Sequence, residues 1–399
     1  MKAPVYMDYQ ATTPVDPRVL EVMLPFFTGK FGNPASRQHA FGWEAESAVE
    51  HARSTIAKIL HAEPREIIFT AGATESNNLA IKGISEARKQ KGNHIITVRT
   101  EHKSVLDVCK KLERSGFEVT YLPVDQFGLL DISQLVAAIT SRTILISVMA
   151  ANNEIGTIQN SSAIGQICRE QKIAFHTDAT QTVGKIPIDV VAMNCDLLSF
   201  SGHKIYGPKG VGGLYLRSSH PKVQLVPQMD GGGHERNLRS GTLNVPGIVG
   251  LARAAEIAAQ EMADESSRLK SFRDKMWSSF SNQLDEVYLN GHPENRLPHN
   301  LNVSFCHVED NVLMMNLKDI AFSTGSACTT ASPEPSHVIR ALNVGPVREQ
   351  SAVRFSLGRF TTPEEVDYVI DRVIANVRSL RSASPSYTRK TREITHTSV

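Results

Sequence analysis

The sequence lacks the features that mark secreted, membrane-bound or nucleic-acid-binding proteins. Its N-terminus has no apolar signal-peptide core, and no apolar run is long enough to span a membrane. The formal net charge is +2 and the basic residues are dispersed, which leaves no charged patch for nucleic acid or a membrane surface. We therefore expect neither of these partners, and we expect the protein in the cytoplasm.

Cysteine is scarce, and the five cysteines form no recognisable pair. They are odd in number and widely separated, with no Cys-x-x-Cys, which argues against a disulfide framework and a self-contained zinc site and favours a reducing compartment. Cys109, Cys168, Cys195 and Cys306 lie in apolar or helical contexts typical of buried thiols. Cys328 lies instead among Ser, Thr, Gly and Ala, where an exposed thiol would be reactive.

What the chain does contain is an alternation of short apolar runs with amphipathic segments. Such alternation predicts an α/β fold with a mostly parallel central sheet and helices on both faces. Ligands of such sheets bind beyond the carboxyl ends of the strands. The predicted strands are 67–70, 94–98, 118–122, 143–148, 173–176 and 197–200, and the helices between them include 75–90, 104–115 and 161–171.

The pattern then changes to one long helix, from about Gly250 to Leu284. We expect this helix to link a large domain, residues 15–262, to a smaller α+β domain made of residues 1–14 and 263–382. Residues 383–399 are polar, and we expect a poorly ordered tail.

Lys204 closely follows the apolar run 197–200, within Ser201-Gly202-His203-Lys204. Burial lowers the pKa of an amine and leaves it able to attack a carbonyl, so a lysine here suits a Schiff base with an aldehyde cofactor. The alternative is a surface lysine at a strand end, which is the commoner environment for lysine.

Other polar residues follow neighbouring predicted strands. Asp178 could hold a heteroaromatic nitrogen protonated, as an electron-sink cofactor requires, and Gln181 could donate to a phenolate oxygen. Thr74 lies in a small-residue turn before a helix, where free amides bind phosphate. For Asp178 and Thr74 the alternative is an N-cap without a ligand.

Three further features each have a functional and a structural explanation. His102 could stack on a planar ring or move protons, or it could be a solvated loop residue. Arg354, inside an apolar strand, could bind a substrate carboxylate, or it could form a structural salt bridge. The segment 231–242, with Arg236 and Arg239, could hold an anion, or it could be a surface turn.

Taken together, these segments resemble the cysteine desulfurases, which are fold-type I enzymes dependent on pyridoxal 5'-phosphate. The resemblance is closest to the iron–sulfur-assembly (IscS) type, and the NifS branch performs the same reaction. It covers roughly residues 5–380. The motifs that carry it include Tyr6-Met7-Asp8-Tyr9-Gln10-Ala11-Thr12-Thr13-Pro14, Gly72-Ala73-Thr74-Glu75-Ser76, Asn152-Asn153-Glu154-Ile155-Gly156, Asp178-Ala179-Thr180-Gln181, Ser201-Gly202-His203-Lys204, Gly325-Ser326-Ala327-Cys328 and Arg354-Phe355-Ser356-Leu357-Gly358-Arg359-Phe360.

The resemblance implies a role for each matching residue. Lys204 would bond the cofactor and move protons, and Asn153 and Arg354 would hold the substrate carboxylate. Cys328 would attack the substrate sulfur, leaving L-alanine and a persulfide on its own side chain, and His102 is our candidate for deprotonating it. The implied cofactor contacts are Ala73, Thr74, His102, Asn153, Asp178, Gln181, Ser201, His203, Lys204 and, from the second subunit of a homodimer, Thr242.

The resemblance also implies partners. L-Cysteine would be the substrate, and the sulfur would pass to an IscU-like scaffold protein for iron–sulfur cluster assembly and to other acceptors, including those of tRNA thiolation. Cys328 would transiently ligate a nascent iron–sulfur cluster on the acceptor. Three alternatives stay open: a selenocysteine lyase, an aminotransferase on the same fold, and a sulfur carrier or scaffold without catalysis.

Overall fold

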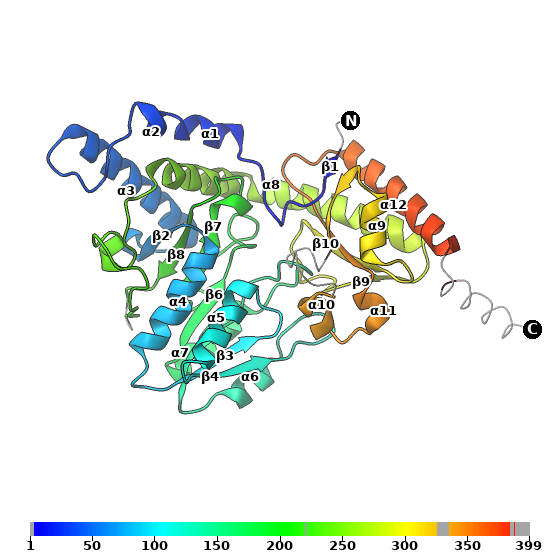
Figure 1. Cartoon of the computed structure of the whole chain (residues 1–399), viewed down its shortest axis with the longest axis horizontal. Coiled ribbons are helices and arrows are strands. Elements are labelled where there is room, and N and C mark those ends of the chain that lie inside the picture. The colour runs from blue at the N-terminus through cyan, green and yellow to red at the C-terminus, as the bar shows by residue number, and fades with distance from the viewer. Residues whose placement is uncertain (1–3, 220–221, 325–334, 384–386, 388–399) are drawn as a thin grey trace, which may run out of the picture.

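A computed structural model describes residues 4–219, 222–324, 335–383 and 387. Its largest element is a seven-stranded sheet in the order β2-β8-β7-β6-β5-β3-β4, with helices packed on it (Figure 1). All neighbouring strands are parallel except the two pairs that β8 makes, so the predicted mostly parallel sheet is confirmed. The strands are β2 (Ile67–Thr70), β3 (His94–Val98), β4 (Glu118–Leu122), β5 (Thr143–Ser147), β6 (Ala174–Asp178), β7 (Leu197–Ser201) and β8 (Gly212–Leu216).

Helices cover both faces of this sheet because side chains alternate between the faces along each strand. Ile68 and Leu145 pack with one helical layer, whereas Phe69 and Ile146 pack with the other. The first layer contains α4 (Ala73–Ala87) and α5 (Lys103–Glu113). The second contains α3 (Ala40–Leu60), α6 (Ile132–Ala138), α7 (Ser161–Gln171) and the first part of α8 (Val245–Gln283), with α1 (Pro17–Met23) and α2 (Pro25–Thr28) alongside.

The predicted long helix is α8, which is 39 residues long and starts five residues earlier than expected. Asn244 caps it by accepting a hydrogen bond from the Gly247 amide at 3.1 Å, so the start is set by a polar side chain that lies before the apolar pattern. The helix contributes Leu251 to the core of the large sheet and Phe280 to a second core. It therefore links the two cores, as its length and spacing predicted.

The second core lies around a four-stranded antiparallel sheet in the order β12-β13-β10-β9. The N-terminal strand joins it from far away in sequence, because Val5 pairs in parallel with Ile320. The division into domains at residues 14 and 262 stays a prediction. The elements are β1 (Val5–Tyr6), β9 (Val287–Leu289), β10 (Asn300–Phe305), α9 (Asp310–Asn316), β11 (Ile320–Ala321), β12 (Ser323–Thr324), α10 (His337–Ala341), α11 (Pro346–Glu349), β13 (Ala352–Ser356) and α12 (Pro363–Ala383).

Two further expectations concern membrane-spanning helices and the C-terminal tail. Within the described ranges, no helix combines the length and apolar character needed to cross a membrane. The predicted polar tail lies outside the described residues, apart from Ala383 and Tyr387.

Candidate active site

A cavity of about 1060 Å³ opens at the carboxyl ends of the parallel strands, where the sequence predicted a ligand site. It brings together ten of the predicted site residues. Thr242 does not line it and is exposed on this chain, and Cys328 lies outside the described residues. The ten are Ala73, Thr74, His102, Asn153, Asp178, Gln181, Ser201, His203, Lys204 and Arg354.

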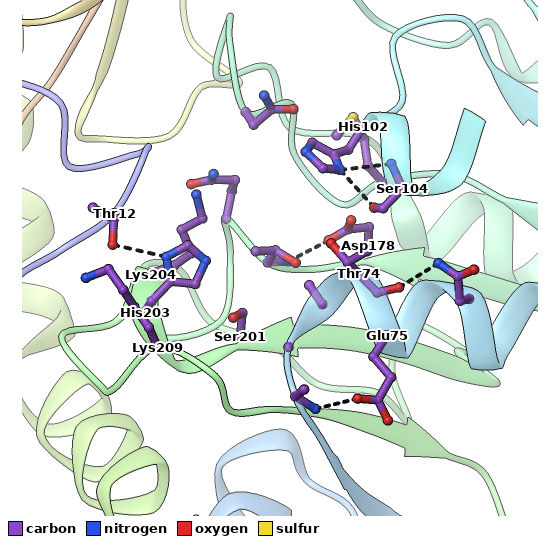
Figure 2. Close-up of a pocket in the computed structure, with 18 of the residues that line it drawn as sticks. Thr12, Thr74, Glu75, His102, Ser104, Asp178, Ser201, His203, Lys204 and Lys209 are labelled. Carbon is purple, nitrogen blue, oxygen red and sulfur yellow. Dashed lines mark hydrogen bonds between the residues drawn. The ribbon is translucent and has the colours of Figure 1, made fainter. Parts of the chain in front are cut away.

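Lys204 lies in a short 3₁₀ turn, Gly202–Lys204, that directly follows β7. Its Nζ donates to the carbonyl oxygens of Gln10 and Ala11 at 2.6 and 2.7 Å. Beside it, Nδ1 of His203 lies 3.1 Å from Oγ1 of Thr12 (Figure 2). Burial, followed by the charge of Lys204, lowers the pKa of His203 to about 4, so this imidazole is neutral at pH 7. Lys204 is thus a cavity residue and not an isolated surface lysine.

The N-terminus of α4 forms another part of the wall. The N-cap of this helix is Gly72, with φ at +149° and no capping side chain, so the alternative that Thr74 is the N-cap is wrong. The first amides of α4 therefore keep their donors for a ligand, and a helix N-terminus favours an anion. The Ser201 hydroxyl lies close by, 3.6 Å from where a Cβ on Gly72 would stand. This set of donors fits a phosphate group.

A chain of hydrogen bonds connects Asp178, the last residue of β6, to His102. Asn77 on α4 donates through Nδ2 to Oδ2 of Asp178 at 2.7 Å and to Oγ of Ser104 at 2.8 Å. Ser104 Oγ lies 2.8 Å from Nδ1 of His102. Asp178 also accepts the Thr180 amide at 3.0 Å. The chain holds a carboxylate and an imidazole in fixed relation at one cavity, as an aromatic cofactor with a basic nitrogen would need.

The tautomer of His102 follows from its position before α5. Its Nδ1 accepts the Ser104 amide at 3.1 Å, so in the neutral ring the proton lies on Nε2. Burial lowers the pKa of His102 below its usual value, and the negative charge of nearby Asp178 opposes this shift. In this tautomer Nε2 is a donor. Deprotonation of Cys328 by this ring would require the proton to leave Nε2, and the role stays a prediction.

Two buried polar residues near the cavity were not predicted from the sequence. His176, two residues before Asp178 on β6, lies between the hydroxyls of Ser147 and Ser199 at 2.8 and 3.0 Å. Burial lowers its pKa to about 4. Glu101 accepts the Met149 amide at 2.5 Å, and burial, with a smaller effect of Asp178, raises its pKa well above the usual value. The available signal was a polar side chain in or beside an apolar strand.

Arg354 on β13 already has several partners. Its Nη2 donates to Oδ1 of Asp8 at 2.7 Å and to Oγ of Ser323 at 3.1 Å, and its Nη1 donates to the Asn153 carbonyl oxygen at 2.7 Å. Its Nε is buried without a partner among the described residues. Arg354 thus forms a structural ion pair and also lines the cavity, and its role in binding a substrate carboxylate stays a prediction.

The two arginines of the segment 231–242 have structural partners on this chain, and anion binding by the segment stays a prediction. Arg236 donates to the Ile67 carbonyl oxygen at 2.6 Å, and Arg239 pairs with Glu75 at 2.8 Å. Glu235 is buried and accepts two hydrogen bonds from Arg53, each at 2.8 Å. The charges of this segment thus attach it to β2, α3 and α4, because a buried carboxylate or guanidinium needs an oppositely charged or polar partner.

The remaining cysteines behave as buried apolar residues. Cys109, Cys168, Cys195 and Cys306 are all buried free thiols, which confirms the expectation. Burial raises the pKa of Cys109 to about 12, so this thiol is not reactive at neutral pH. In the part of the chain that the structure describes, no three histidine, cysteine or acidic side chains are grouped to hold a metal ion.

Comparison with known proteins agrees with this geometry. The aminotransferase class-V family model matches residues 5–369. The cysteine desulfurase IscS of Pectobacterium carotovorum subsp. carotovorum (strain PC1) is 56% identical over 387 residues, which cover 96% of this chain and 95% of the relative.

Two solved structures have the same fold. A NifS-like protein superposes with a TM-score of 0.88 at 41% identity, covering 94% of this chain and 99% of its own. SspA in complex with cysteine superposes with a TM-score of 0.79 at 40% identity, covering 90% and 100%. The chain therefore belongs to the aminotransferase class-V family and, within it, to the cysteine desulfurases.

Proposed function

We propose that this desulfurase converts L-cysteine to L-alanine with pyridoxal 5'-phosphate and keeps the removed sulfur as a persulfide on Cys328. The observation that supports this most is that Lys204, Asp178 and the open N-terminus of α4 meet in one cavity. These are the amine, the carboxylate and the anion site that this cofactor needs. When bound, the cofactor supplies an electron sink for the substrate's carbon atoms.

The chain's own residues orient that cofactor in the proposal. Ala73, Thr74, Ser201 and His203 hold its phosphate, and Thr242 of a second subunit completes the set. Asp178 binds the ring nitrogen and Gln181 the ring oxygen. Gln181 already donates through Nε2 to the Gln10 carbonyl at 3.2 Å, which fixes its direction in the cavity. His102 covers the ring.

Substrate recognition follows from Arg354 and Asn153. The α-carboxylate of L-cysteine would bind Arg354 and share or replace the contact with Asp8. A guanidinium binds a carboxylate best through two parallel N–H groups. The positive charge of Arg354 is therefore held in place before substrate arrives, and substrate exchanges one carboxylate partner for another.

Sulfur removal is the role proposed for Cys328. Its thiolate attacks the sulfur of the substrate, an S–S bond forms, and the C–S bond breaks with its electron pair left on the substrate carbon. Protonation of that carbon gives L-alanine, and Lys204 is our candidate for the proton donor. An ordinary thiol with a pKa of about 8.5 is mostly protonated at pH 7, so a base such as His102 must first take the thiol proton.

Assembly and partners form the finer part of the proposal. We infer a homodimer, because exposed apolar side chains gather on α1, α2 and the start of α3 and because Thr242 does not reach the cavity of its own chain. We place the reaction in the cytoplasm, where free thiols persist, and name an IscU-like scaffold and other sulfur acceptors as recipients. Transient iron–sulfur ligation by Cys328 belongs to the same proposal. The exposed apolar residues are Leu20, Leu24, Phe27, Phe31, Phe41 and Trp43.

The experiment that tests this function is a visible absorption spectrum of the purified protein with L-cysteine, together with an assay for L-alanine. We expect a cofactor band that changes with L-cysteine, and alanine formation that is lost in both Lys204→Ala and Cys328→Ala. Alanine formation that survives Cys328→Ala would favour a lyase. A wild-type protein with no band after addition of pyridoxal phosphate would favour a carrier without catalysis.

A further inference from the structure

One turn of the large domain contacts the chain on both sides of residues 325–334. Arg354 donates one hydrogen bond to the Asn153 carbonyl oxygen, at 2.7 Å, and another to Oγ of Ser323, at 3.1 Å. Ser336 donates through its hydroxyl to Oε2 of Glu154 at 2.5 Å. Ser323 lies two residues before the segment and Ser336 two residues after it. Consecutive residues, Asn153 and Glu154, are therefore linked to the two flanks of the segment that carries Cys328.

The turn itself is firmly held. Asn152 accepts the Glu154 amide through Oδ1 at 2.8 Å and donates through Nδ2 to the Thr100 carbonyl at 2.9 Å. The carbonyl oxygen of Glu154 accepts hydrogen bonds from Asn300 and Asn302 on β10, at 2.9 and 3.1 Å. Contacts from both the large sheet and the small sheet thus fix the backbone on which the Glu154 side chain stands.

The carboxyl group of Glu154 is buried at a cost in free energy that is unusual for a purely structural contact. Its side chain is buried, and burial raises its pKa while the Ser336 hydroxyl lowers it. Burying a carboxyl group costs free energy that a well-packed apolar side chain would not. A second contact supports the same helix, because Nε2 of His337 lies 3.0 Å from the Glu101 carbonyl oxygen. The start of α10 is thereby tied to two turns at the cavity.

We propose that Glu154 and Ser336 are positioning residues for sulfur removal. Their hydrogen bond fixes the point at which the chain leaves residues 325–334, relative to Asn153 and Arg354. The inference rests on the proposed role of Cys328 as the nucleophile. Neither Glu154 nor Ser336 lines the cavity, so their loss should spare cofactor and substrate binding. It should slow the reaction, because a small displacement of a reacting group reduces its rate.

The test compares two substitutions at Glu154 in the enzyme loaded with pyridoxal phosphate. Glu154→Leu removes the acceptor but leaves Ser336 free to cap α10 through the Val338 amide, at 3.0 Å. Glu154→Gln keeps an acceptor. We expect Glu154→Leu to lower kcat for alanine formation by about tenfold or more, with the L-cysteine concentration that half-saturates the absorbance change altered by less than about twofold. Glu154→Gln should retain a rate near that of the wild type.

Ser336→Ala and a matched control complete the design. Ser336→Ala removes both the Glu154 contact and the α10 cap and should show the same loss of kcat. Asn160→Ala removes the cap of α7, where Oδ1 accepts the Ala163 amide at 3.2 Å, and should leave kcat unchanged. The inference is overturned if Glu154→Leu keeps the wild-type kcat, or if cofactor and substrate binding fall in parallel with kcat. A wild-type protein that forms no alanine would instead refute the proposed function.

Discussion

Asn77 connects α4 to Asp178, the residue that we propose binds the ring nitrogen of the cofactor. Its amide donates to Asp178 and Ser104 at once. We expect Asn77→Ala to weaken cofactor binding by about tenfold to a hundredfold, because a hydrogen bond to a charged group contributes about 1.5–3 kcal/mol. The measurement is a titration of the enzyme with pyridoxal phosphate, followed by absorbance.

A matched substitution tests whether removing an asparagine elsewhere in the chain also weakens cofactor binding. Asn316 on α9 is exposed and donates to the Val312 carbonyl oxygen at 2.8 Å, and Asn316→Ala should leave cofactor affinity unchanged. Equal affinities for Asn77→Ala and the wild type would show that Asp178 does not depend on this donor.

His176 should make the protein acid-sensitive. Its pKa is about 4 in the fold because burial disfavours the charged ring, against an ordinary value of 6.5. The unfolded chain therefore binds more protons between these values, and the free energy of unfolding falls as pH drops from 6.5 to 4. The full loss from this residue is about 3 kcal/mol.

Comparison of unfolding at several pH values tests this assignment. His176→Gln, which does not titrate, should lose about 3 kcal/mol less than the wild type between pH 7 and pH 4. Denaturant unfolding at each pH gives both curves. Parallel curves would mean that His176 is not the neutral buried group described here.

At the residue scale, the groups that carry charge or follow a strand could be predicted from the sequence. Lys204 and Asp178 each come at or just after the end of an apolar run, where α/β sheets bind ligands. Asn77 could not be predicted, because a polar residue in the first turns of a helix is usually solvated. The pairing of Asp8 with Arg354 was equally hidden, since 346 positions separate the two residues.

At the scale of elements, the ion pair of Arg53 and Glu235 attaches the segment 231–242 to α3 and β2. Both side chains are almost fully buried, at 4% and 1% exposed, and Glu235 also accepts the Phe69 amide at 2.7 Å. Glu235→Ala should lower the free energy of unfolding by about 3–5 kcal/mol, because it leaves a buried guanidinium without its partner.

An exposed pair at the opposite edge of the same sheet provides the control. Glu118 and Arg142 are about half exposed, and Glu118→Ala should cost at most about 1 kcal/mol. Urea denaturation of the two variants gives both numbers. Similar costs at the two sites would contradict a structural role for Glu235.

Elements were predictable where apolar spacing was regular and were missed where buried strands are polar. The runs that became β3, β5 and β7 matched the prediction within one residue. Strand β10 was not predicted, although Asn300 and Asn302 alternate with its apolar residues as they would in a half-buried strand; in the structure both asparagines are buried. Strand β8 begins with two glycines, which pack against Phe200 and Gly72 and carry no apolar signal.

At the scale of the whole molecule, the proposal requires two chains for a complete site. Thr242 is exposed on its own chain and does not line its cavity, yet we assign it to the cofactor phosphate of a partner. Thr242→Ala should therefore weaken pyridoxal phosphate binding by about tenfold, the effect of losing one hydrogen bond to a charged group. Cofactor titration, with light scattering to count chains, measures both quantities.

A second exposed hydroxyl provides the comparison for that variant. Ser54 on α3 donates to the Glu50 carbonyl oxygen and does not line the cavity, and Ser54→Ala should bind the cofactor as the wild type does. A single-chain species with full cofactor affinity, or unchanged affinity in Thr242→Ala, would contradict the shared site.

The central claim is that sulfur leaves L-cysteine and stays on Cys328, and the intact mass of the protein tests it most directly. After one turnover with L-cysteine, in the absence of acceptor or reductant, the wild-type chain should gain the mass of one sulfur atom, and Cys328→Ala should gain none. A wild-type chain of unchanged mass, or a Cys328→Ala chain that still gains sulfur, would contradict the account.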